Sequence, residues 1–286
     1  QNCLYGVDID PGAVEIAKLR LWLSLVVDEE DIKQIKPLPN LDYKIVCGNS
    51  LLGVEKNLFN LELFNEFEKQ KLLYFDETDV KKKQEYKSQI DDLIRQITNN
   101  NETFDFEVYF SEVFHEKGGF DVVIANPPYV SFGLRDNKNA AKEWASLMRK
   151  LYPGSAEYKI SLYALFIDLA LKLARKGGVV CYITPDSFLL GRYFSKLRKT
   201  LLDNTSINRF VMFEKDFWKS GVVGRPTISL YQKGIHQKIT TAILAEDEKA
   251  LSSIDIREYT YPQEYFKNVP YNRFRLFFSP IAKKFV

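Results

Sequence analysis

The ten residues FDVVIANPPY, at positions 120–129, join an apolar run to a polar ending. The run 120–125 predicts a buried strand, and the tetrapeptide Asn126-Pro127-Pro128-Tyr129 follows at its carboxyl end, where open α/β sheets place their ligands. The Asn126 carboxamide oxygen and the Pro127 carbonyl can accept the two N–H groups of an exocyclic amine, and the Tyr129 ring can stack on a flat ring. The tetrapeptide also fits a strand that simply ends in a proline turn, so the rest of the chain has to distinguish the two interpretations.

Strands and helices alternate along most of the chain. Strands are predicted at 3–9, 43–47, 120–125 and 179–184, one helix from Pro11 after the capping residue Asp10, and another at about 161–175 that stops at Gly177-Gly178. Segments 207–213 and 227–232 predict a further, antiparallel pair. This alternation predicts a mostly parallel, doubly wound α/β sheet.

The composition is that of a globular protein. With 286 residues, of which 45% are hydrophobic and 27% charged, the chain can bury a sizeable core, and we expect one large domain with an embellishment. Cys3, Cys47 and Cys181 stand apart in apolar runs, which indicates reduced, buried thiols in a cytoplasmic protein. The chain has only two histidines and no Cys-x-x-Cys pair, so no metal site is expected. No apolar stretch approaches the roughly 20 residues that span a bilayer, so no membrane contact is expected.

Asp8 ends the first predicted strand, directly before a helix. A carboxylate at that place can accept hydrogen bonds from the two hydroxyls of a ribose. The alternative is that Asp8 and Asp10 both cap the helix, an interpretation that we accept for Asp10.

The segment Phe120–Val130 resembles the catalytic motif of amino-group methyltransferases that use S-adenosylmethionine, chiefly the N6-adenine DNA methyltransferases. Enzymes that methylate protein glutamine or ribosomal RNA guanine carry the same four residues. The resemblance implies a Rossmann-like methyltransferase sheet and a direct transfer of methyl to adenine N6, without a metal. Asn126 and Pro127 would then favour a more tetrahedral amine nitrogen as the methyl approaches.

The resemblance also assigns residues to the cofactor. Asp8 matches the ribose-binding acid, and Ile9 the residue against the cofactor adenine. Asn49, in the turn 48–51, stands where the family more often has an aspartate that reads the adenine amino group, so its contact would lack charge assistance. Phe166 matches the aromatic that sandwiches the adenine, although it equally fits the buried stripe of its helix.

The segment 217–234 resembles the loop and strand that end the domain in the γ-ordered adenine methyltransferases. There an aromatic residue stacks on the flipped target base; Phe217 matches best in register, and Trp218 is the close rival. Basic residues gather around this loop, with Asp203, Glu214 and Asp216 as their few acidic neighbours. They are Arg192, Lys196, Arg198, Lys199, Arg209, Lys215, Lys219 and Arg225. We expect double-stranded DNA with a flipped adenine as the partner, bound through Arg192, Lys196, Lys219 and Arg225; the alternative is that these charges form a solvated face.

The resemblance is closest to type IIG restriction–modification proteins and covers about 3–234, apart from a helical insertion. We therefore expect a cofactor-side half at 1–53, the insertion at 54–118, a catalytic half at 119–234, and a linker or the start of a DNA-specificity region at 235–286. The charges of the insertion fit a solvated face or a helical arm that touches DNA. Further segments of the same parent chain, a nuclease and a specificity domain, are the other expected partners.

One departure from the family pattern is serious: the glycine-rich cofactor turn and its strand, expected before Asp8, are missing. The sheet should thus be incomplete, with a vacant position between the strands that end at Asp8 and Asn126. We expect the 286-residue chain to bind S-adenosylmethionine weakly or not at all, and to be inactive by itself. A protein-glutamine or ribosomal RNA methyltransferase, and a non-catalytic DNA-binding segment of a restriction complex, remain the alternatives.

Overall fold

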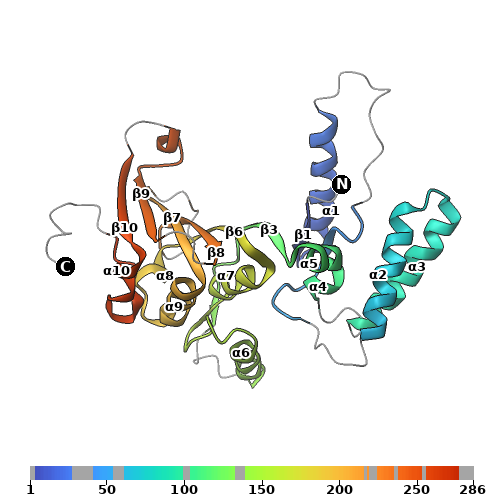
Figure 1. Cartoon of the computed structure of the whole chain (residues 1–286), viewed down its shortest axis with the longest axis horizontal. Helices are drawn as coiled ribbons and strands as arrows, with labels where there is room; N and C mark the ends of the chain where they lie inside the picture. The colour runs from blue at the N-terminus through green and yellow to red at the C-terminus, as the bar shows by residue number, and fades with distance from the viewer. Residues whose placement is uncertain are drawn as a thin grey trace. The chain divides into compact units, whose positions relative to one another are not determined.

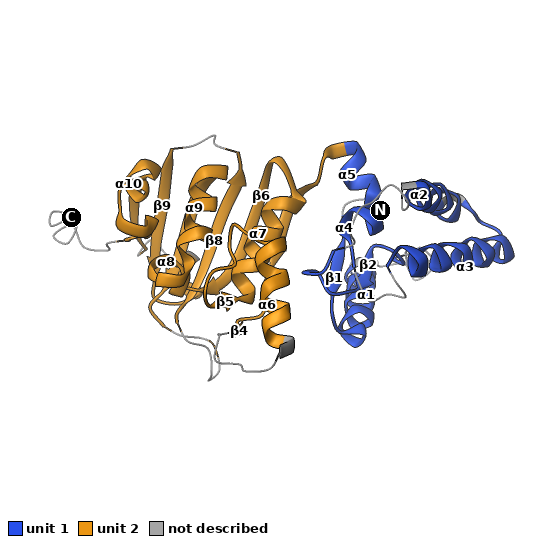
Figure 2. Ribbon diagram, turned by 90° about the horizontal axis from the view of Figure 1, so that it is seen from below, with its two compact units in different colours: residues 1–116 blue, residues 117–286 orange. Residues whose placement is uncertain are grey.

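The computed structural model describes residues 4–27, 41–53, 61–98, 104–132, 139–215, 218, 224–234, 238–252 and 256–276. The chain forms two compact units, residues 1–116 and 117–286, which are coloured separately in Figure 2. The boundary between them lies within two residues of the predicted end of the helical insertion.

Unit 1 is built on a short parallel pair of strands. Its elements are β1 (Gly6–Asp8), α1 (Pro11–Val26), β2 (Ile45–Cys47), α2 (Leu61–Asp76), α3 (Val80–Ile97), α4 (Phe106–Tyr109) and α5 (Ser111–Lys117). Strand β1 pairs with β2 so that Asp8 lies opposite Cys47. The predicted start of α1 is confirmed: Asp10 Oδ1 accepts from the backbone N–H groups of Gly12 at 2.7 Å and Ala13 at 3.1 Å.

Helices α2 and α3 form a hairpin within the predicted insertion (Figure 1). Their joint face is apolar, and Phe67, Ile90 and Ile94 are buried there. Polar bonds attach the hairpin to the rest of unit 1: Lys71 is buried and pairs with Glu112 Oε2 at 2.8 Å. The insertion is therefore packed into unit 1 through an apolar face and a buried ion pair, while many of its other charges are exposed.

Unit 2 contains a six-stranded sheet in the order β10-β9-β7-β8-β6-β3. The strands are β3 (Phe120–Ala125), β6 (Ala174–Pro185), β7 (Thr205–Phe213), β8 (Pro226–Lys233), β9 (Ile239–Ala245) and β10 (Arg257–Pro262), and a separate short pair consists of β4 (Ser131–Phe132) and β5 (Ile160–Ser161). The helices are α6 (Asn139–Leu151), α7 (Leu162–Leu173), α8 (Ser187–Leu190), α9 (Ser195–Asn204) and α10 (Gln263–Lys267).

The sheet of unit 2 is mixed, which corrects the expectation of a mostly parallel one. Strands β3 and β6 are parallel, as are β7 and β9, whereas β6–β8, β7–β8 and β9–β10 are antiparallel. The antiparallel pairing predicted for 207–213 and 227–232 is confirmed. An apolar run indicates a strand but not its direction, and only the connection between strands decides that.

Helices α7 and α9 cover one face of this sheet (Figure 2), and the main core lies beneath them. Phe210, Tyr231 and Val180 are fully buried in it. The other face is open at β3, where Val122 is 59% and Ile124 74% exposed. The prediction that Phe120–Ala125 is buried is thus wrong for the face that carries Val122 and Ile124.

Helix α7 ends at Leu173, four residues before the predicted stop at Gly177-Gly178. Gly119 and Gly178 instead allow β3 and β6 to approach each other closely. A Cβ on Gly178 would lie 2.7 Å from the Phe120 carbonyl oxygen, and one on Gly119 would lie 2.5 Å from the Leu173 carbonyl oxygen. Glycine is therefore required where β3 begins beside β6.

Residues 238–276 belong to the same compact unit as the tetrapeptide 126–129, so the predicted boundary at residue 234 does not coincide with a boundary between units. They supply β9, β10 and α10, and Phe274 is buried in the main core. Arg198, which is fully buried, donates from Nη2 to the Tyr271 carbonyl at 3.0 Å and from Nη1 to the carbonyls of Phe188 at 2.7 Å and Gly191 at 2.8 Å. This arginine ties the C-terminal segment to the loops around α8.

Two strands keep one open edge each along the described residues. Strand β1 pairs only with β2, and β3 only with β6. A groove of about 400 Å³ follows β1 and α1, and it is lined by residues that include Leu4, Gly6, Ala17 and Leu21. No helix among the described residues is long and apolar enough to cross a membrane.

Candidate active site

The tetrapeptide Asn126-Pro127-Pro128-Tyr129 leaves the carboxyl end of β3 beside the end of β6. The parallel register sets Ala125 opposite Tyr182, so the tetrapeptide meets the residues that follow Tyr182. The Tyr129 hydroxyl donates to the Asn126 carboxamide oxygen and lies 3.2 Å from the Ile183 carbonyl oxygen. Burial raises the pKa of the Tyr129 hydroxyl, so it remains a proton donor at neutral pH. In this structure Tyr129 itself therefore satisfies the acceptor expected to bind an amine.

The chain beyond Tyr129 is held against the start of α7. The Val130 carbonyl accepts from the Leu162 N–H at 2.9 Å, and β4 pairs with β5 so that Ser131 lies opposite Ser161. These bonds fix both ends of the tetrapeptide, one through β3 and the other through β4. The position of Tyr129 is thus set by backbone pairing on each side.

Aromatic rings surround Tyr129. The Trp218 ring lies 4.7 Å from it between centroids, at an interplanar angle of 45°, and the Tyr163 ring lies 6.5 Å away, edge to face. Tyr163 is buried, stacks on Phe194 at 5.5 Å and shares a 2.7 Å hydrogen bond with Ser187 Oγ. Sequence reasoning missed Tyr163; its place one helical turn before Phe166 was the available signal.

The aromatic predictions have different outcomes. Phe217 lies outside the described residues, whereas its rival Trp218 is described and lies against Tyr129. Phe166 is half-buried and packs against the main core of unit 2, which agrees with the structural alternative and leaves its proposed contact with cofactor a prediction.

In unit 1, the structure brings Asp8, Ile9 and Asn49 together at one edge of the β1–β2 pair. The Asp8 carbonyl accepts from the Gly48 N–H at 2.9 Å, which joins the two turns. Asp8 Oδ1 accepts from the Asp10 N–H at 2.8 Å, Asn49 Oδ1 accepts from the Leu51 N–H at 3.1 Å, and Ile9 is 70% exposed. Each carboxylate or amide oxygen still has free acceptor capacity. These acceptor oxygens fit the hydroxyls of a ribose and the amino group of an adenine, with the apolar Ile9 beside them.

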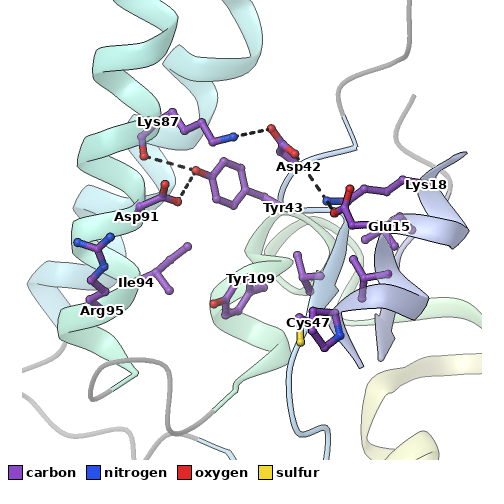
Figure 3. Close-up of a pocket in the computed structure, with 14 residues that line it drawn as sticks. Glu15, Lys18, Asp42, Tyr43, Cys47, Lys87, Asp91, Ile94, Arg95 and Tyr109 are labelled. Atoms are coloured by element: carbon purple, nitrogen blue, oxygen red, sulfur yellow. Dashed lines mark hydrogen bonds and ion pairs between the residues drawn. The ribbon is translucent and has the colours of Figure 1, made fainter. Parts of the chain in front are cut away.

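A pocket of about 370 Å³ lies elsewhere in unit 1, between α1, β2 and α3 (Figure 3). Its charged groups are paired: Asp42 lies 3.1 Å from Lys87 Nζ and 3.8 Å from Lys18 Nζ, and the Tyr43 hydroxyl donates to Asp91 Oδ1 at 2.8 Å. None of the predicted cofactor residues lines it. We interpret it as the polar seam that joins the hairpin α2–α3 to α1 and β2.

Cys47 is exposed and Cys181 is half-buried, which corrects the expectation that these two thiols are buried. Cys3 lies outside the described residues.

The predicted basic surface is smaller than the sequence suggested. Arg192, Lys196 and Arg225 are exposed, and Lys219 lies outside the described residues. Other members are used within the fold: Arg198 is buried, Lys199 pairs with Asp203 at 2.6 Å, and Lys215 pairs with Glu246 at 2.6 Å. Only part of the local positive charge is therefore available to a partner.

Comparison with known proteins identifies relatives among restriction–modification enzymes. A model of the Eco57I restriction-modification methylase family matches residues 2–218. A type II methyltransferase of Bacillus subtilis is 32% identical over 153 residues, which cover 52% of this chain and 28% of that protein. A type II restriction enzyme and methyltransferase of Escherichia coli is 29% identical over 215 residues, which cover 74% of this chain and 17% of that protein. The matches thus span less than a third of the length of these relatives.

Among solved structures, the type IIG restriction endonuclease BpuSI matches 54% of this chain and 20% of its own, with 18% identity and a TM-score of 0.43. The ATP-dependent type ISP restriction-modification enzyme LlaBIII, bound to DNA, matches 84% of this chain and 15% of its own, with 13% identity and a TM-score of 0.49.

Proposed function

Because this chain belongs to the Eco57I restriction-modification methylase family, we propose that it carries the catalytic segment of a DNA methyltransferase that transfers methyl from S-adenosylmethionine to adenine N6. The observation that carries this proposal is the amide and ring pair Asn126 and Tyr129 at the end of β3, with the Trp218 ring 4.7 Å from Tyr129. An amide acceptor beside two aromatic rings suits a flat base with an exocyclic amine.

The amine nitrogen of adenine is a weak nucleophile because its lone pair is delocalised into the ring. Asn126 Oδ1 and the Pro127 carbonyl would accept its two N–H groups and favour a tetrahedral nitrogen, which strengthens both hydrogen bonds as positive charge develops. S-adenosylmethionine, when bound, supplies an electrophilic methyl on a sulfonium. The Asn126 and Pro127 oxygens would hold the amine while it accepts this methyl group, the sulfur would keep the electron pair of the broken C–S bond, and the surplus N6 proton would leave to solvent.

The base has to displace an internal hydrogen bond before it can react. The Tyr129 hydroxyl donates to Asn126, so an entering amine replaces that donor. The hydroxyl keeps a second acceptor, the Ile183 carbonyl at 3.2 Å, and need not lose all its partners. The Trp218 ring is the described aromatic nearest to Tyr129 and would stack on the base; each such contact is worth about 1–3 kcal/mol.

Residues of unit 1 would hold the cofactor. We propose that Asp8 binds the ribose hydroxyls, that Ile9 lies against the adenine, and that Asn49 accepts from its amino group; Phe166 is proposed as the aromatic that sandwiches the adenine. The Asn49 oxygen already accepts one backbone hydrogen bond, at 3.1 Å, which limits its strength as a reader. Weak binding of S-adenosylmethionine to the 286-residue chain remains our prediction, and micromolar affinity by calorimetry would contradict it.

DNA would be bound through the exposed cations Arg192, Lys196 and Arg225. Lys219, which lies outside the described residues, is the fourth proposed contact. The target base has to leave the duplex, at a cost of a few kcal/mol that stacking can offset. Nuclease and specificity segments of a longer parent chain are the proposed further partners, since the relatives of this chain include combined restriction enzymes and methyltransferases.

The test is modified-base mapping of genomic DNA from cells that express the parent gene, beside an Asn126→Ala control. We expect N6-methyladenine at one repeated motif, and its loss in the control, because removing one transition-state hydrogen-bonding group lowers the rate by about 100-fold or more. An absence of methylated adenine in both samples would refute the DNA assignment and direct attention to ribosomal RNA and protein glutamine.

A further inference from the structure

Two tyrosines form an exposed stacked pair in unit 2. Tyr158, in the loop between α6 and β5, and Tyr193, in the turn 192–194, have ring centroids 5.5 Å apart and an interplanar angle of 27°. Tyr158 is 58% and Tyr193 38% exposed, so neither ring is needed to fill the core. Large aromatic rings left at the surface often mark a binding site.

Both rings are held in place by their neighbours. Glu157 accepts from the Lys196 N–H at 2.6 Å and from Ser195 Oγ at 3.1 Å, which ties the Tyr158 loop to the start of α9. On the other side, Phe194 stacks on the buried Tyr163, which itself contacts Tyr129. The loop of Tyr158 continues into β5, whose partner β4 follows the tetrapeptide. The pair is thus a fixed surface attached to the elements that position Tyr129.

The charge around the pair is positive. Lys159, Arg192 and Lys196 are exposed, and along the described residues none of their charged side-chain groups forms an ion pair. Glu157, which precedes Tyr158 in the chain, accepts hydrogen bonds from Ser195 and Lys196 at the start of α9. Aromatic faces with cations beside them are the recognised means by which proteins bind unpaired nucleotides, since the rings stack on bases and the cations contact phosphates.

We propose that Tyr158 and Tyr193 form a second base-stacking site, distinct from the Asn126 site, which binds an unpaired base of the nucleic acid. Lys159, Arg192 and Lys196 contact the adjoining phosphates. The inference rests on the proposed function only for the choice of DNA as ligand. The base-stacking site itself is inferred from the exposure, stacking and charge of these residues. It adds a binding determinant that acts outside the proposed Asn126 site.

The test uses the full chain and a fluorescein-labelled oligodeoxythymidine of about 20 nucleotides, with anisotropy as readout. A matched probe carries the same phosphates on abasic sugars. We expect the double variant Tyr158→Leu, Tyr193→Leu to raise Kd for the thymidine probe about 10-fold and to leave Kd for the abasic probe unchanged. The double Phe variant should keep the parent's affinity. Equal affinity of parent and Leu variant, or an equally weakened affinity for both probes, would refute base stacking.

Two further variants separate stacking from other effects. Tyr271→Leu removes another exposed ring of unit 2, whose cation neighbour is Arg273 and which has no ring partner among the described residues, and should leave both affinities unchanged. The double variant Arg192→Gln, Lys196→Gln should reduce the salt dependence, log Kd against log salt, by about 0.7 for each phosphate that the variant no longer neutralises. An unchanged slope would refute the binding of phosphates by these two cations.

Base mapping and anisotropy can fail independently. Binding that depends on Tyr158 and Tyr193, without methylated adenine in the genome, would refute the proposed function and support the base-stacking site. Methylated adenine without tyrosine-dependent binding would refute the base-stacking site alone. If the tyrosines bound a protein, and the chain showed no preference between the thymidine and abasic probes, the proposed base-stacking site would also be refuted.

Discussion

Unit 1 and unit 2 each contain an edge strand that ends in proposed site residues, β1 with Asp8 and β3 with Asn126. The surroundings of the two strands differ. Strand β3 is the edge of a six-stranded sheet with a large core on one face, whereas β1 belongs to a two-stranded sheet covered by α1. On α1, Ile16 is 59% and Leu19 52% exposed. The comparison indicates that the segment around Asn126 is fixed by the packing of unit 2, while the proposed cofactor residue Asp8 has far less packing around it.

The largest expected effect is on the core of unit 2. Phe210→Ala removes a fully buried ring and should lower the free energy of unfolding by about 3–5 kcal/mol. Single-tryptophan versions that keep either Trp22, in unit 1, or Trp144, in unit 2, would report the two units separately during urea denaturation. We expect Phe210→Ala to shift the Trp144 transition and not the Trp22 transition. A joint shift of both transitions would show that the units unfold together and would remove the contrast.

An intermediate effect is expected on the reaction. Tyr129→Phe keeps the ring but frees the Asn126 oxygen, so an entering amine no longer displaces a hydroxyl donor. We expect KM for DNA to fall by about 2- to 10-fold with kcat little changed, since one neutral hydrogen bond contributes about 0.5–1.5 kcal/mol. Steady-state methylation assays of the parent protein would measure this. A rise in KM would instead indicate that the hydroxyl contacts the base.

A smaller effect concerns Asp168 on α7, which is 5% exposed and accepts from Ser155 Oγ at 2.8 Å. Burial raises its pKa, so the folded state holds a proton more tightly than the unfolded state. Its contribution to stability is complete below the ordinary pKa of aspartate and is lost as pH rises through the raised value. Asp168→Asn should therefore gain stability relative to the parent on going from about pH 4 to about pH 7, by about 1 kcal/mol or less. A constant difference across urea denaturations at these pH values would contradict the raised pKa.

The smallest effect is expected on the open face of β3. Ile124→Thr should change the free energy of unfolding by less than about 0.5 kcal/mol, because the side chain is 74% exposed. Leu19→Gln on α1 is the matched substitution in unit 1, with a side chain that is 52% exposed, and should be similarly neutral. A decrease of more than about 1 kcal/mol at Ile124 in thermal denaturation would mean that another element covers this face.

Strand β3 and the tetrapeptide that follows it were predictable because both signals are local. Phe120–Ala125 is a strand with the predicted bounds, and the resemblance of the following residues to restriction–modification methyltransferases is confirmed by the family match. The parallel pairing of β1 with β2 also brings Asp8 and Asn49 to one edge, as their order along the chain suggested. Local composition is sufficient for features of this kind.

Other features depend on contacts between distant residues, and the sequence did not disclose them. The early end of α7 follows from the pairing of Ala174 with Phe120, and the exposure of Ile124 follows from what packs on its face. Arg198 counted as part of a DNA-facing surface, yet it is buried because three backbone carbonyls surround it. A residue type sets which bonds are possible, and the tertiary fold decides which are made.

The Tyr129 hydroxyl donates to the Asn126 oxygen, so it competes with every entering base for that acceptor. Thymine presents a keto oxygen where adenine presents an amine, and two acceptors facing each other repel. When such a base enters, the Tyr129 hydroxyl keeps its hydrogen bond to the Asn126 oxygen, and the base dissociates. Adenine and cytosine each offer two N–H groups and can replace the phenol without loss. Under the proposed chemistry, the Tyr129–Asn126 hydrogen bond thus discriminates against bases that present a keto oxygen at this position, before methyl transfer takes place.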